Sequence, residues 1–132
     1  TGVLALIEHL APDDVLCHSD LQPRNVIMTA QGPRLIDWLG AARAPAAYEI
    51  ANCHVLLAEI GPEHADDPER ATVSSILQAE YARLAGIAPA ALTAAMQPYL
   101  PIVRVFLLLG GAKPDMRERQ MQRVEAALRP EG

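Results

Sequence analysis

Three polar side chains in one short stretch have the types and the spacing that phosphoryl transfer requires. Asp20 is followed five positions later by Asn25, and Asp37 lies twelve positions beyond Asn25. Such a transfer needs a carboxylate that orients the attacking hydroxyl and accepts its proton. It also needs oxygen ligands that hold Mg²⁺ against the phosphates. Asp20 is therefore the candidate base, and Asn25 and Asp37 are the candidate metal ligands.

A small β hairpin would bring the two candidate metal ligands together. Residues 26–28 form a short apolar run, residues 30–33 are a cluster of turn formers, and residues 34–36 run back. Antiparallel pairing of the two runs carries Asn25 and Asp37 to the same end of the ribbon. We therefore expect their side chains to lie close enough to share one cation.

The rest of the chain predicts a helix-rich domain around this hairpin. A strand over residues 15–17 leads into the motif, and residues 39–47 are expected to form a loop. Residues 48–60 are apolar on most sides, which is typical of a central core helix. The periodicity and the helix-start signals predict helices over residues 3–10 and 48–60, from Pro68 to Gly86, from Pro89 to the prolines at 98 and 101, over 102–109, and from Pro114 onward.

The last of these helices is expected to be amphipathic. Met121, Val124 and Leu128 share the face that we expect to point inward, and arginines occupy the other side. Residues 102–109 are almost wholly apolar, so the preceding helix is expected to be buried.

Length and composition indicate a single globular domain over residues 1–132. Apolar residues make up 51% of the chain, charged residues 20%, and the net charge is -5 with no basic block, so no nucleic-acid partner is expected. The longest apolar run, residues 100–112, contains Pro101 and Arg104, so no membrane association is expected. Two cysteines and no secretory pattern favour the cytoplasm.

The segment over residues 15–57 resembles the aminoglycoside phosphotransferase/choline kinase family. The chain reads HSDLQPRN from His18 to Asn25, where the family pattern is roughly H-G-D-L-H-P-x-N, and it keeps the family's I-D-W at residues 36–38. The resemblance implies the C-terminal lobe of a protein-kinase-like fold. That lobe is α+β and mainly α, helical with a small β hairpin that carries the catalytic loop and the metal site.

The same resemblance implies roles for individual residues. Asp20 corresponds to the catalytic base, Asn25 and Asp37 correspond to the Mg²⁺ ligands, and His18 corresponds to the structural histidine of the loop. Glu49 stands where the family has an aspartate that ties the catalytic loop to the core helix. The chain departs from the pattern at other positions, with Ser19 for glycine, Gln22 for histidine and Ala44 for an aspartate.

The implied activity is that of a small-molecule kinase. It would transfer the γ-phosphoryl group of ATP, or of another NTP, to a substrate hydroxyl with Mg²⁺. Protein kinases share the first motif, but they place a segment ending in A-P-E before the next core helix. Only about ten residues separate Asp37 from Tyr48 here, which favours a small-molecule substrate.

One feature of the family has no counterpart in this sequence. The chain has no glycine-rich strand-loop-strand, and Lys113 is its single lysine. We therefore expect a C-terminal lobe without the N-terminal nucleotide lobe, inactive by itself, with an apolar cleft surface that supports self-association. The alternative is a non-catalytic fragment or pseudokinase scaffold that binds a partner.

Several residues keep two interpretations at this point. Trp38 either lines the substrate pocket or packs the hairpin against the helices. The acids from Glu59 to Glu69 either bind a cationic substrate or lie in a solvated loop, which the pattern favours. The Cys-His pairs at 17–18 and 53–54 could be drawn as a zinc site, but they lack the usual ligand spacing.

Overall fold

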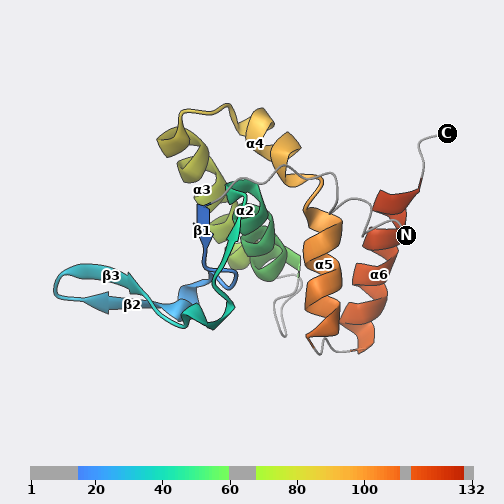
Figure 1. Ribbon diagram of the computed structural model, residues 1–132, viewed down its shortest axis with the longest axis horizontal. Coiled ribbons are helices and arrows are strands. Elements are labelled where there is room, and N and C mark those ends of the chain that lie inside the picture. Colours follow the sequence, from blue (N-terminus) through green and yellow to red (C-terminus); the bar gives the residue numbers. More distant parts are fainter. Residues whose placement is uncertain (1–14, 60–67, 111–113, 130–132) are drawn as a thin grey trace.

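The computed structural model describes residues 15–59, 68–110 and 114–129 (Figure 1). The predicted helix over residues 3–10 lies outside the described residues. The described part is mainly helical and carries two small antiparallel sheets, which agrees with the α+β class.

Helix α2 (Ala46–His54) is at the centre of the helical body, and it continues into a π-helical segment, η3 (Val55–Glu59). The predicted central helix is thus confirmed through Glu59, although it begins slightly earlier. The three helices α3, α4 and α5 contact α2, whereas α6 packs against α5 at the far side of the body. Their bounds are Pro68–Ala85 for α3, Pro89–Met96 for α4, Leu100–Leu109 for α5 and Pro114–Leu128 for α6.

Prolines and a glycine determine where these helices begin and end. Pro68, Pro89 and Pro114 each occupy the first helical position, where the missing N–H costs nothing and the fixed φ suits the helix. Pro101 lies in the first turn of α5. Gly86 follows α3 with a φ of +67°, the left-handed conformation that ends helices at little cost. The starts at Pro68, Pro89 and Pro114 and the end at Gly86 were predicted, whereas α5 begins at Leu100, two residues before its predicted start.

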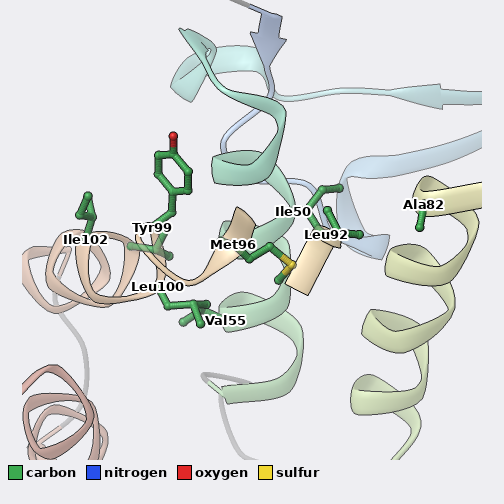
Figure 2. Close-up of a cluster of buried hydrophobic side chains, with 10 residues drawn as sticks. Ile50, Val55, Ala82, Leu92, Met96, Tyr99, Leu100 and Ile102 are labelled. Atoms are coloured by element: carbon green, nitrogen blue, oxygen red, sulfur yellow. The ribbon is translucent and has the colours of Figure 1, made fainter. Parts of the chain in front are cut away.

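The core lies where α2, α3, α4 and α5 meet (Figure 2). Ile50 and Val55 from the central helix belong to the same buried cluster as Leu92 and Met96 of α4, and all four are at most 4% exposed. Full burial of such a side chain contributes about 1.5–3 kcal/mol, so α4 is held by packing rather than by its length. The buried cluster is completed by Ala51, Ala82, Tyr99, Leu100, Ile102 and Val103.

The two small sheets position the candidate site. Strand β1 (Val15–Cys17) pairs antiparallel with β4 (Ala42–Ala44), and β2 (Val26–Thr29) pairs with β3 (Gly32–Leu35). The predicted hairpin is therefore confirmed, and Figure 1 shows it projecting from the helical body. Gly32 has a φ of +103°, which a residue with a side chain rarely adopts, so this glycine closes the turn.

Strand β4 corrects the prediction of a loop over residues 39–47. A 3₁₀ turn, η2 (Trp38–Gly40), precedes this strand, and α2 follows it. Only Ala41 and Pro45 between these elements are irregular. The sequence Ala-Arg-Ala has little intrinsic preference for a strand. These three residues are extended because they pair with the backbone of β1, which is remote in sequence. Intrinsic strand propensity carries no information about such a distant partner.

The inward face of α6 also differs from the prediction. Met121 and Leu128 are 46% and 36% exposed, whereas Met116, Gln120 and Val124 are buried. The buried residues recur every four positions and form one narrow stripe. A single neighbour, α5, makes the main contact with α6, so a narrow stripe is all that the helix buries.

Helix α5 is buried only in its first half. Ile102 and Val103 are in the core, but Phe106 and Leu109 are 54% and 78% exposed, so the expectation of a wholly buried helix was wrong.

In the described ranges no single helix is long and apolar enough to cross a membrane. Helices α4 and α5, bent by 50° at their junction, meet that length and composition together.

Candidate active site

The candidate catalytic loop, residues 18–25, connects β1 to β2 and contains a single 3₁₀ turn, η1 (Pro23–Asn25). Pro23 occupies the first position of this turn, and the Asn25 N–H donates to the Gln22 carbonyl at 2.9 Å. The turn buries Asn25 to 5% exposure. The asparagine side chain is therefore directed back into the loop, toward Asp20.

The Asp20 carboxylate is oriented by donors from its own loop. Asn25 Nδ2 donates to Oδ2 at 2.9 Å and also to the Asp20 main-chain carbonyl at 2.9 Å, and Gln22 Nε2 donates to Oδ1. Arg24 Nη2 lies farther away, at 3.4 Å from Oδ2. The Asp20 side chain remains 29% exposed. A carboxylate that is fixed in direction and still reached from solvent is suited to orient a hydroxyl and accept its proton.

His18 joins the loop to the base of the hairpin. Its Nδ1 accepts the Asp20 N–H at 3.3 Å, so Nε2 carries the hydrogen and donates to the Ile36 carbonyl at 2.8 Å. The imidazole is 3% exposed and touches the Trp38 ring edge-on, with the centroids 4.6 Å apart. The Trp38 indole N–H donates to the Leu35 carbonyl at 3.1 Å. These contacts join Trp38 to the loop and to the hairpin, and its place in a substrate pocket stays a prediction.

Helix α2 holds the backbone of the catalytic loop through three side chains. The Glu49 carboxylate accepts the Ser19 N–H, with distances of 3.0 and 3.3 Å to its two oxygens. Asn52 Nδ2 donates to the Ser19 carbonyl, and the Cys53 thiol donates to the Leu21 carbonyl. Glu49 thus reaches the loop, although the family places a shorter aspartate there.

Sequence reasoning identified Glu49 but missed its two neighbours. Asn52 and Cys53 follow Glu49 by three and four positions, which is the spacing of one helix face. This spacing could have identified them. Residues three and four positions after Glu49 lie on the same face of the helix, so a face that contacts the loop at Glu49 also brings Asn52 and Cys53 toward it.

Ser19 adopts a backbone conformation that explains the glycine of the family pattern. Its φ is +64°, in the left-handed region. A residue with a β-carbon adopts this region at a cost of order 1 kcal/mol, whereas glycine adopts it freely. The contacts from Glu49 and Asn52 to the Ser19 peptide groups hold the loop in this shape.

The two cysteines are structural. Burial, followed by the negative charge of Glu49, raises the pKa of the Cys17 thiol to about 11 and that of Cys53 to about 12. Both thiols are therefore neutral at ordinary pH, and a neutral thiol is a poor nucleophile. Among the described residues, no three His, Cys, Asp or Glu side chains gather to hold a metal, so the Cys-His pairs do not form a zinc site.

The candidate Mg²⁺ ligands lie at the same end of the hairpin, as the turn predicts. The Ile36 N–H donates to the Asn25 carbonyl at 2.9 Å, which extends the β2–β3 pairing by one step, and Asp37 follows directly. Asn25 is buried, whereas Asp37 is exposed and left-handed, with a φ of +62°.

The chemistry of these two side chains fits Mg²⁺. This ion takes oxygen ligands and usually uses only one or two carboxylates, with phosphate and water completing its shell. Because Asn25 donates its amide hydrogens to Asp20, its Oδ1 is the atom left to face a cation. Asp37 supplies the anionic oxygen. That the two share one ion stays a prediction.

Glu59 corrects the interpretation of the acids from Glu59 to Glu69 as a solvated group. Its side chain is only 8% exposed. The carboxylate oxygens accept hydrogen bonds from the Arg104 guanidinium at 2.8 and 3.0 Å and lie 2.7 Å from the Arg123 guanidinium. Burial alone would raise the pKa of Glu59, but the hydrogen bond and charge of Arg104, followed by Arg123, hold it below its usual value. This carboxylate is occupied, so it offers nothing to a cationic substrate. The acids at positions 63, 66 and 67 lie outside the described residues.

Strand β1, the hairpin and the turn that follows it expose many large apolar side chains. Leu39 is 96% exposed and Met28 is 77% exposed. The others are Val15, Leu16, Ile27, Leu35, Ile36 and Trp38.

Comparison with known proteins places this geometry in a family. A sequence model described as "Phosphotransferase enzyme family" matches residues 2–92, about two thirds of the chain. The match includes the whole loop, the hairpin, α2 and α3. No curated protein and no solved structure matches the chain significantly.

Proposed function

This chain belongs to the phosphotransferase enzyme family, and we propose that it carries the catalytic loop and the metal ligands of an aminoglycoside phosphotransferase-like small-molecule kinase. The reaction is transfer of the γ-phosphoryl group of ATP, or of another NTP, to a substrate hydroxyl. The helical body with its projecting hairpin corresponds to the C-terminal lobe of a protein-kinase-like fold. The observation that carries the proposal is the Asp20 carboxylate, oriented by Gln22 and Asn25 and still open to solvent.

Asp20 is the group that receives the proton in this proposal. The substrate hydroxyl donates a hydrogen bond to the carboxylate, which points the oxygen lone pair at the γ-phosphorus. As the new P–O bond forms and the bond to the leaving nucleotide diphosphate breaks, the proton passes to Asp20. The donors around the carboxylate keep it aimed before the substrate arrives, so little reorganisation is needed at the moment of reaction.

Asn25 and Asp37 are the residues that would hold Mg²⁺. The ion supplies charge neutralisation at the phosphates. Asn25 has two tasks here, because its amide nitrogen orients the base while its oxygen is available to the metal. One side chain therefore couples the position of the base to the position of the phosphates.

The test compares variants of the full-length protein in an assay of NTP-dependent phosphorylation of small alcohols. Asp20→Ala should lower turnover by roughly 10²–10⁴-fold, the usual contribution of a positioned base. Asp37→Ala should abolish the Mg²⁺-dependent activity. Leu109→Ala, at an exposed position at the end of α5, is the control and should behave like the wild type.

Two outcomes would overturn the proposal. Undiminished turnover in Asp20→Ala would exclude Asp20 as the base. NTP binding without any phosphoryl transfer in the wild type would favour the non-catalytic scaffold, for which the exposed apolar hairpin offers a docking surface.

A further inference from the structure

A groove lies between the catalytic loop and α3. It consists of three adjoining hollows with volumes of about 270, 390 and 490 Å³. Val73 of α3 lines all three, and each hollow shares further walls with the next. Gln22, Pro23 and Leu57 line the first two, and Leu21 and Leu77 line the second and the third.

The groove begins one side chain away from the candidate base. Gln22 donates from Nε2 to Asp20 Oδ1, and the same side chain lines the first two hollows. Arg24 also contacts the Asp20 carboxylate and lines the first hollow. A molecule in the first hollow therefore lies beside two side chains that contact the candidate base.

The walls of the second and third hollows are almost wholly apolar. Gln22 is the polar residue of the second hollow, whose other walls are hydrocarbon side chains and the neutral Cys53 thiol. The third hollow is lined by Ile50, Ile76, Tyr81 and Leu84 in addition to the shared residues. Its one acid, Glu80, pairs with Arg83 at 2.9 Å.

The charged side chains that line the first hollow also interact with other groups of the protein. Arg70 donates to the carbonyls of Leu56 and Leu57, at 3.1 and 3.3 Å. Glu69 also has an interaction within the protein. This surface is thus poorly suited to a polycation and well suited to hydrocarbon, since pockets of this size with few polar groups bind apolar bodies.

We propose that the groove binds the apolar body of the acceptor, an alcohol whose hydroxyl is attached to a hydrocarbon chain or ring. The hydroxyl end lies at Gln22 and Asp20, and the hydrocarbon extends along Val73 toward Leu84. Gln22 is a positioning residue, because it contacts the base on one side and the groove on the other. The inference rests on the proposed function and specifies its substrate class.

The test uses unbranched primary alcohols from butanol to decanol. Each methylene that enters the groove should raise kcat/KM for NTP-dependent phosphorylation by about fourfold, until the groove is filled. Val73→Glu places a charge on the shared wall and should abolish this dependence on chain length. Phe106→Glu is the matched control, because Phe106 is an exposed apolar residue of α5, outside the groove.

A second variant protects the test against misfolding. Val73→Phe keeps the wall apolar but fills the space, so it should weaken the longest alcohols most and reduce the gain in kcat/KM per methylene. Thermal midpoints identify any variant that fails to fold. Equal response of Val73→Glu, Val73→Phe and Phe106→Glu to chain length would overturn the assignment of the groove.

Binding measured by calorimetry without NTP separates this inference from the proposed function. Binding that strengthens with chain length and is lost in Val73→Glu supports the groove, even if phosphoryl transfer is absent and the kinase proposal fails. Turnover of small polar alcohols without any dependence on chain length overturns the groove and leaves the kinase proposal standing. Absence of both binding and turnover for the whole series also overturns the groove.

Discussion

Glu49 and Glu59 lie ten residues apart on the same continuous helix, yet they stabilise opposite ends of the molecule. Glu49 accepts a backbone N–H of the catalytic loop, near the start of α2. Glu59 accepts two arginines, Arg104 from α5 and Arg123 from α6, at the end of η3. The central helix therefore holds the site at one end and the C-terminal helices at the other.

The two contacts differ in the cost of losing them. Arg104 is only 12% exposed, so removal of Glu59 leaves a buried guanidinium without its counter-ion. Removal of Glu49 leaves a neutral N–H that has lost one hydrogen bond. The comparison predicts that changes at Glu59 affect the stability of the fold, whereas changes at Glu49 affect the site.

Glu59→Ala should have the largest effect on stability. Loss of one partner of a buried ion pair typically costs about 3–5 kcal/mol. Glu59→Gln should cost less, because its amide oxygen still accepts from Arg104. Denaturant unfolding measures both, with Glu80→Ala as the control, since Glu80 pairs with Arg83 on the exposed face of α3 and should matter little. Equal stability of Glu59→Ala and Glu80→Ala would show that the buried pair is not important for the fold.

The sequence predicted Glu49 but not the role of Glu59, and the reason is the range of the contacts. Glu49 was found because it stands at the position of an aspartate in the family pattern. The arginine partners of Glu59 lie on two later helices, and nothing local to Glu59 indicates them. Its acidic neighbours in sequence suggested a solvated group instead.

The same distinction applies to the rest of the fold. The hairpin and the helix starts at Pro68, Pro89 and Pro114 were predictable, because turn and proline chemistry acts locally. Strand β4 and the inward face of α6 were not, because each depends on a partner far away in sequence. Within the candidate site, His18, Asp20 and Asn25 came from the motif, but the donors around Asp20 required the three-dimensional loop.

Substitutions of Ser19 test the shape of the loop that Glu49 holds. Ser19→Val places a β-branched residue at a φ of +64° and should cost about 1–3 kcal/mol of stability, with a further loss of turnover as Asp20 moves. Ser19→Gly restores the residue that the family pattern has at this position and should change stability by less than about 1 kcal/mol. Urea unfolding and steady-state kinetics distinguish the two. A Val variant as stable and as active as the Gly variant would contradict a constrained loop.

Glu49→Ala should show the opposite balance from Glu59→Ala. Its stability cost should be about 1 kcal/mol, the value of a typical hydrogen bond, but turnover should fall by at least about tenfold because the Ser19 backbone is released. Glu49→Gln retains an oxygen acceptor and is the matched control. If Glu49→Ala destabilised the fold as much as Glu59→Ala while leaving kcat unchanged, the division between the two ends of the helix would be wrong.

His54, which lies between the two glutamates, gives the smallest and most specific effect, a dependence of stability on pH. Its Nδ1 accepts the Gln78 amide at 3.2 Å, and its Nε2 lies 3.7 Å from Glu59. Burial lowers the pKa of His54; the charge of Glu59 opposes this, and those of Arg104 and Arg123 add to it. The unfolded chain therefore binds a proton first as the pH falls below about 6.5, so stability decreases from there down through the folded pKa.

Glu59 produces a second decrease at lower pH, because its own folded pKa is lowered and its contribution is lost as the pH falls from about 4.5 through that pKa. His54→Gln keeps an acceptor for Gln78 but does not titrate, so it should remove the first decrease and retain the second. Urea midpoints measured from pH 7.5 to pH 3.5 separate the two. Identical pH profiles for His54→Gln and the wild type would mean that His54 does not couple the end of the central helix to protonation.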